Sequence, residues 1–150
     1  MYYHILIRMT KNQYIFKAKS EKVNIGITKF LSNFASQTSV FSLYLLKSNT
    51  KLAKSERLKL RKTLNATEFS LALLDTNSSI IISHRTRHFS SWSEKAHQIL
   101  SSCGFLSDIE IEKITCISFE AKKILRNSFI KNINSLTDKM TQSVIHRAYD

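Results

Sequence analysis

The chain has 150 residues, of which 43% are hydrophobic and 10% aromatic, a composition typical of a folded protein rather than a disordered one. No apolar run approaches the roughly 20 residues that a membrane-spanning helix needs, and the N-terminus lacks the basic start, long apolar middle and cleavage site of a secretory signal. The net charge of +12 raises polyanions, nucleic acids above all, as a partner class to test.

The first half of the chain alternates patterns typical of strands and helices. A short apolar run predicts a strand at 3–8, and apolar side chains at helical spacing predict a helix at 19–35. A second apolar run predicts a strand at 40–46, and a helix at 52–64 follows it. The expected order is therefore strand, helix, strand, helix.

A run of basic side chains overlaps the second of these helices. Residues 47–62 hold seven Lys and Arg residues against the single acid Glu56. Aromatic residues are not interleaved with the run, and no segment has the aromatic signature of an RNA-recognition sheet. The whole chain is also rich in Lys, Ile, Asn and Ser and contains no proline. We therefore interpret the run as the solvated face of a helix and keep nucleic-acid binding as the alternative hypothesis.

The second half repeats the alternation of strand and helix. Its expected elements are a short apolar segment and a turn within 68–79, a strand at 80–85, a helix within 90–104, a strand at 109–119, a long helix at 121–143 and a last strand at 144–149. No linker rich in proline or glycine separates the halves. We therefore predict a single α+β domain spanning 1–150, in which helices pack on a sheet.

The helix within 90–104 has signals at both ends. Ser91 and Glu94 have the spacing of a capping box, and Ser90 is a competing N-cap. Gly104 suits the left-handed residue that ends a helix. The predicted buried face consists of Trp92, Ala96, Ile99, Leu100 and Cys103. This pattern predicts that Trp92 is a core residue.

The histidines and cysteines are weak candidates for chemistry. His84 and His88 fall at a strand end, where a spacing of four does not bring side chains together. Adding Cys103 or Cys116 gives no close ligand pair of the kind found in zinc sites. His97 lies six residues from Cys103, on a different face of one helix, which does not suit an activated thiolate. Two cysteines provide no disulfide framework, which predicts reduced thiols and a cytoplasmic protein.

Phosphate binding and acid–base chemistry have no better support. Gly26 and Gly104 are the only glycines, which excludes a glycine-rich phosphate loop. Glu110 and Glu112 alternate with isoleucines on a predicted strand, which we interpret as a solvated face rather than an acid–base pair. From the residues alone we therefore predict no catalytic residue and no metal site.

Residues 80–120 carry a resemblance to a known family. The run IIISHRTRHFSSWSEKAHQILSSCGFLSDIEIEKITCISFE resembles the N-terminal domain of the large, single-chain phosphoribosylformylglycinamidine synthase, also called formylglycinamide ribonucleotide amidotransferase. The run DKMTQSV at 138–144 resembles the end of the last long helix of that domain. The chain keeps, in ungapped register, the family residues Arg85, Ser90, Trp92, Ser93, Lys95, Ala96, Ile99, Cys103, Gly104 and Glu112.

The motif also has departures from the family pattern. Ser91 and Arg87 stand where the family has proline and glycine, and Glu110 and Ile114 stand where its strand has arginine and glycine. Proline and glycine fix local backbone geometry, so their loss changes the turns that the family motif implies.

The resemblance implies a fold and a place in metabolism. It implies a domain similar to a fused pair of the small subunits found in split forms of the enzyme. The complete enzymes use ATP, Mg²⁺ and glutamine-derived ammonia in purine biosynthesis, as ligases, but the nucleotide site and the glutaminase nucleophile lie outside this domain. No cofactor is therefore expected in this chain, and a structural role is expected for the motif residues Arg85, Ser90, Trp92, Lys95, Gly104 and Glu112.

These expectations combine into one principal hypothesis and two alternatives. The principal hypothesis is a stand-alone or truncated N-terminal domain, non-catalytic by itself, that assembles the enzyme. Its partners are the synthetase and glutaminase parts of the same enzyme, with self-association as a further option and without a membrane or nucleic acid. The alternatives are a small basic α+β module that binds nucleic acid and an eroded gene fragment without independent function.

Overall fold

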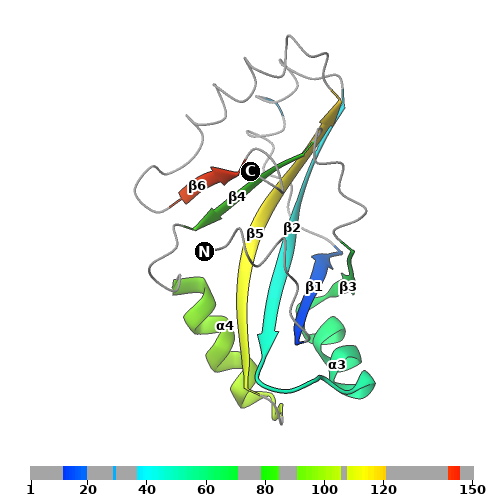
Figure 1. Ribbon diagram of the computed structural model, residues 1–150, viewed down its shortest axis with the longest axis vertical. Coiled ribbons are helices and arrows are strands. Elements are labelled where there is room, and N and C mark those ends of the chain that lie inside the picture. Colours follow the sequence, from blue (N-terminus) through cyan, green and yellow to red (C-terminus); the bar gives the residue numbers. More distant parts are fainter. Residues whose placement is uncertain are drawn as a thin grey trace.

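Within the residues that the structure describes, the chain forms an antiparallel sheet of six strands in the order β3-β1-β2-β5-β4-β6, with two helices packed beside it (Figure 1). The computed structural model describes residues 12–19, 29, 37–70, 79–84, 91–105, 108–120 and 142–145. The elements are β1 (Gln13–Ala18), β2 (Gln37–Ser48), α3 (Lys54–Leu64), β3 (Ala66–Glu68), β4 (Ser79–His84), α4 (Ser91–Ser102), β5 (Ile109–Glu120) and β6 (Gln142–Ile145). The predicted α+β class is confirmed.

The two longest strands form the centre of the sheet. β2 and β5 pair along their whole length, from Gln37 opposite Glu120 to Ser48 opposite Ile109 (Figure 1, cyan and yellow). Both strands are rich in β-branched and other apolar residues, which suit a pleated and buried surface. The remaining strands add to the two outer sides of this pair.

Apolar side chains fill both faces of the sheet. Successive residues of a strand point to opposite faces, so Ile15 and Phe16, or Leu45 and Leu46, contribute to different clusters. The helix-side cluster, which α3 and α4 cover, contains Phe16, Leu46, Leu52, Leu60, Ala66, Leu100, Ile109 and Ile111. The opposite cluster contains Ile15, Leu43, Leu45, Ile81, Ile114 and Cys116.

The boundaries of α3 follow from local hydrogen bonding. At its start, the Glu56 carboxylate accepts the backbone N–H of Ala53 at 3.3 Å, which satisfies one of the donors that a helix leaves open. At its end, Asn65 has the left-handed conformation with φ 48°, one that asparagine tolerates. Leu60, which is fully buried, anchors the helix on the helix-side cluster.

Five predicted elements are confirmed, and two strands were missed. The predictions at 40–46, 52–64, 80–85, 90–104 and 109–119 correspond to β2, α3, β4, α4 and β5. Neither β1, whose six residues QYIFKA do not alternate between polar and apolar, nor β3, which has three residues, was predicted. A strand this short carries too few side chains for a periodicity to show.

The predicted boundary near the C-terminus was wrong. We expected a helix to 143 and a strand from 144, whereas β6 already begins at Gln142. The polar residues there carry no helix-stop signal. The predicted strand at 3–8 lies outside the described residues, as do nearly all of the predicted helix at 19–35, the turn before β4 and the helix from 121 to 141. The single-domain assignment and the fused pair of subunits stay predictions.

Candidate functional site at the α4–β5 edge

α4 lies against a stretch of β5 that, within the described residues, has no strand on the edge away from β2. β4 pairs with β5 only between Thr115 and Ser118, so the other half of that edge, towards Ile109, is left open by the sheet. An open edge exposes backbone N–H and C=O groups that need partners. α4 covers this half of the edge, as Figure 1 shows.

Two side chains of α4 satisfy the backbone of this edge. Ser93 Oγ donates to the carbonyl of Ile111, and His97 Nδ1 lies 2.8 Å from the carbonyl of Ile109. Four residues of a helix advance about 6 Å and two residues of a strand about 6.7 Å, so the two spacings match when the elements lie side by side. Because a carbonyl only accepts, the His97 proton that faces Ile109 is on Nδ1. The helix is thereby fixed in register along β5.

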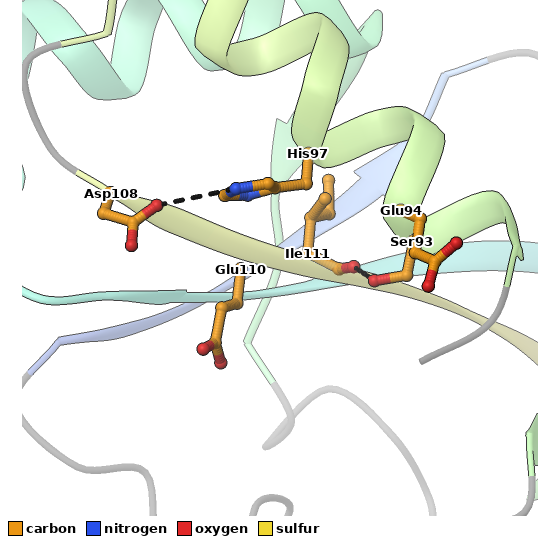
Figure 2. Close-up of a pocket in the computed structure, with 6 residues that line it drawn as sticks. All are labelled: Ser93, Glu94, His97, Asp108, Glu110 and Ile111. Carbon is orange, nitrogen blue, oxygen red and sulfur yellow. Dashed lines mark hydrogen bonds and ion pairs between the residues drawn. The ribbon is translucent and has the colours of Figure 1, made fainter. Parts of the chain in front are cut away.

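A pocket of about 230 Å³ opens beside these contacts. It is lined by Ser93, Glu94, His97, Asp108, Glu110 and Ile111 (Figure 2). The free His97 nitrogen, Nε2, lies 3.8 Å from the Asp108 carboxylate. Glu110 points to the other side of β5, away from His97 (Figure 2). The acidic side chains that line the pocket therefore do not converge on one point.

Ser93, His97 and Asp108 are the residue types of a hydrolytic triad, but their arrangement does not suit one. A triad needs a serine hydroxyl that gives its proton to a histidine, which the acid in turn orients. Here the Ser93 hydroxyl donates a hydrogen bond to the Ile111 carbonyl, and His97 Nδ1–H donates one to the Ile109 carbonyl. Asp108 faces Nε2, the nitrogen that would have to receive the serine proton. The trio therefore holds α4 on the sheet and is not assembled for nucleophilic attack.

Trp92 occupies the first turn of α4 and reaches across β5. Its ring stacks on Tyr44 of β2, with the ring centroids 5.7 Å apart and the planes 16° from parallel. Trp92 and Tyr44 are both half-buried and pack on the helix-side cluster. The structure thus packs Trp92 against the core but leaves it half-buried, so the prediction of a core residue is confirmed in part.

The other family-motif residues have separate positions. Lys95 is exposed on α4. Gly104 has φ +76° and ends α4, as predicted for a left-handed residue. Beside it, Lys59 of α3 donates to the carbonyl of Cys103 and lies over the ring of Phe105, which joins the two helices. Arg85 and Ser90 lie outside the described residues.

The predicted buried face of α4 was partly wrong. Ile99 has 59% of its surface exposed, and Cys103 is exposed as well. The face that contacts the sheet instead consists of Trp92, Ser93, Ala96, His97 and Leu100. Two polar residues, Ser93 and His97, take positions that an apolar pattern assigns to core residues, because the edge of β5 offers them carbonyl acceptors. Ser91 is the first residue of α4 and is therefore already helical, so it is not the N-cap.

The interpretation of Glu110 and Glu112 as a solvated face was also wrong for one of them. Glu110 is exposed, but Glu112 is only 7% exposed. It pairs with Leu45 of β2 and shares a face of β5 with Ile114 and Cys116, members of the opposite cluster. One Glu112 oxygen accepts the backbone N–H of Lys113 at 3.1 Å. The sequence alternation suggested one wet face, whereas both faces of this sheet are covered.

The described residues do not support a metal or thiolate site. Within them, no group of three or more His, Cys, Asp or Glu side chains could hold a metal ion. Cys103 is exposed at the end of α4, whereas Cys116 is buried in the sheet. The side chains of His84 and His88 lie outside the described part. In the same part of the chain, no helix is long and apolar enough to cross a bilayer.

Comparison with known proteins identifies the family. Residues 41–150 match the family model described as formylglycinamide ribonucleotide amidotransferase N-terminal. The chain belongs to this family. The match begins within β2 and includes α3, α4, β5 and the pocket, while β1 precedes it. As an amidotransferase N-terminal domain, the chain is associated with purine biosynthesis. A search of curated proteins finds no match.

Proposed function

We propose that this chain is the assembly domain of a formylglycinamide ribonucleotide amidotransferase and has no catalytic activity of its own. In this role it holds the synthetase and glutaminase parts of the enzyme in place. The observation that carries the proposal is that the side chains of Ser93 and His97 bind the backbone of β5. These are the residues best suited to chemistry in the pocket, and each is committed to a backbone carbonyl of β5.

The residues that the structure describes do not fit the ATP and Mg²⁺ that the enzyme family uses. Gly104, one of two glycines, ends α4 and belongs to no phosphate loop. The carboxylates of Glu94 and Glu110 line the same pocket, but Glu110 points away across β5 (Figure 2). Both ligands, and glutamine, are therefore assigned to the partner parts of the enzyme, where a ligase reaction would take place.

The two thiols support a cytoplasmic location as part of the proposal. Cys103 and Cys116 are both free. Burial raises the pKa of Cys116 to about 12, although the nearby positive charge of Lys17 acts in the opposite direction. A protein with unpaired thiols suits a reducing compartment such as the cytoplasm. A role in purine synthesis would be compatible with the same location.

The proposal is tested by measuring turnover with the purified chain. We expect hydrolysis of neither ATP nor glutamine above the background of a buffer control. His97→Gln and Ser93→Ala serve as variants of the two pocket residues best suited to nucleophilic chemistry. Turnover by the wild-type chain that either substitution abolishes would show that the pocket is an active site and would overturn the proposal.

A further inference from the structure

The outward side of α3 carries positive charge that the described part of the molecule does not neutralise. Lys54, Leu58 and Lys62 follow each other at intervals of four residues and so lie along one side of the helix. Lys51 stands just before the helix, and all four side chains are exposed. We call these four residues the α3 outer face. Leu60, two positions from Leu58 and thus on the other side, is fully buried.

Five of the seven cations between 47 and 62 fall into two groups. Arg57 pairs with Glu68 of β3 at 3.5 Å, and Lys59 is held by the Cys103 carbonyl and the Phe105 ring. These two residues attach α3 to the rest of the fold. By contrast, the side chains of Lys51, Lys54 and Lys62 have no ion pair or hydrogen bond to another described residue. The only acid between 47 and 62, Glu56, already accepts a hydrogen bond from Ala53.

An apolar residue lies at the centre of this charge. Leu58 is 48% exposed and has a lysine one turn before it and another one turn after it. An apolar centre with a charged rim is the usual composition of a protein interface. A phosphate backbone, in contrast, offers no apolar group to a leucine, and the α3 outer face has no aromatic ring on which a base could stack.

We propose that the α3 outer face docks an acidic protein surface, in which carboxylates surround a small apolar pocket that receives Leu58. This inference rests on the proposed assembly role and specifies the chemistry of the partner surface. A second copy of this chain is a poor occupant, because two molecules of net charge +12 repel each other. The occupant is therefore a surface of the synthetase or glutaminase part, with opposite charge.

The test uses the purified chain and the separately purified synthetase and glutaminase parts, with binding measured by calorimetry. The first variant, Lys54→Gln with Lys62→Gln, removes two charges from the α3 outer face, and the second, Leu58→Ser, removes its apolar centre. The control, Ser91→Glu with Gln98→Glu, makes the same change in net charge at two exposed positions of α4. Unfolding midpoints in urea confirm that each variant is folded.

We expect the wild-type chain to bind one of the two parts and each α3 variant to bind it roughly tenfold or more weakly, while the control changes little. Wild-type binding should also weaken between about 150 mM and about 500 mM NaCl, because salt screens the charged rim. Equal affinity of the α3 variants and the wild type would overturn the inference but leave the assembly role standing. A wild-type chain that binds neither part would overturn both.

One further measurement distinguishes nucleic-acid binding from binding to a protein partner. A DNA duplex of about 20 base pairs is titrated under the same conditions, where non-specific binding to phosphates is weak and falls steeply with salt. We expect this weak behaviour. Submicromolar duplex binding at about 200 mM salt that Lys54→Gln with Lys62→Gln abolishes would assign the α3 outer face to nucleic acid instead.

Discussion

Trp92 of α4 stacks on Tyr44 of β2, with 5.7 Å between the ring centroids, so α4 is joined to a strand beyond the one it lies against. Tyr44 pairs with Lys113 of β5, which means that the indole ring crosses over β5 to reach it. Together with the hydrogen bonds of Ser93 and His97 to β5, this contact attaches the first two turns of α4 to the sheet. Two of these three residues, Trp92 and Ser93, are family-motif residues, whereas His97 is not.

The first prediction concerns Trp92 itself. Trp92→Ala should lower the free energy of unfolding by about 2–3 kcal/mol, a cost that includes the lost stacking on Tyr44. The cost is smaller than for a fully buried tryptophan because the ring is half-buried. Ile99→Ala is the matched control on the same helix and should cost little, since Ile99 is 59% exposed. Urea denaturation of both variants measures the difference. Equal midpoints would show that Trp92 does not anchor α4.

A second prediction tests where α4 begins. Ser91→Pro should be tolerated or stabilising by about 0.4–1 kcal/mol, because proline suits the first position of a helix and restricts the unfolded chain. Gln98→Pro, in the middle of α4, should cost about 3 kcal/mol or more because it removes a helical hydrogen bond. Thermal unfolding followed by circular dichroism compares the two. A collapse of the fold in Ser91→Pro would contradict the boundary at Ser91.

How far the sequence predicted this fold depends on the length of each pattern. β2, α3 and β5 have eleven or twelve residues each, long enough for their periodicity to be clear. β1 and β3 lie at one side of the sheet and have only six and three residues, too few for a hydrophobic periodicity to be recognised. Their existence follows from pairing with β2 and with each other, which no local pattern reveals.

The candidate site was predicted less well than the fold. The capping signals and the apolar spacing found α4, but they placed Ile99 and Cys103 inside and left Ser93 and His97 without a role. The signal for these two residues was their own spacing of four, which matches two steps along a neighbouring strand. That match becomes meaningful only once β5 is known to have an open edge beside α4, and this depends on tertiary pairing.

A third prediction isolates one of these hydrogen bonds. Ser93→Ala should cost about 1–3 kcal/mol, because it leaves the carbonyl of the buried Ile111 without the hydroxyl donor. Ser102→Ala is the matched control, since its hydroxyl is exposed and bonds only within α4, to the carbonyl of Gln98, and it should stay within about 0.5 kcal/mol of wild type. Unfolding in urea measures both. If the two substitutions cost the same, Ser93 does not hold α4 on the edge of β5.

The fourth prediction follows from the buried thiol of Cys116. Burial raises its pKa from 9.0 to about 12, so the folded chain keeps a proton that the unfolded chain loses above pH 9. The contribution of this group to stability is therefore complete below pH 9 and falls by about 1.4 kcal/mol per pH unit from there towards pH 12. Urea unfolding of wild type and Cys116→Ala between pH 7 and about 10.5 separates this effect from the titration of tyrosines and lysines.

The difference in unfolding free energy between wild type and Cys116→Ala should be constant up to about pH 9 and shrink above it. A difference that stays constant through this range would mean that Cys116 is not buried as described. Thiol reagents provide an independent check on the same residue. At neutral pH the exposed Cys103 should react quickly, while Cys116 should react only when the chain opens.

The most direct test of the assembly role is reconstitution of the amidotransferase from its parts. Glutamine-dependent formation of the amidine is measured with the synthetase and glutaminase parts alone, with increasing amounts of this chain, and with the chain alone. The account predicts no turnover by the chain alone and a saturable rise in the coupled rate when it is added to the other two parts. A coupled rate that does not respond to the chain, or turnover by the chain without its partners, would contradict the assembly role.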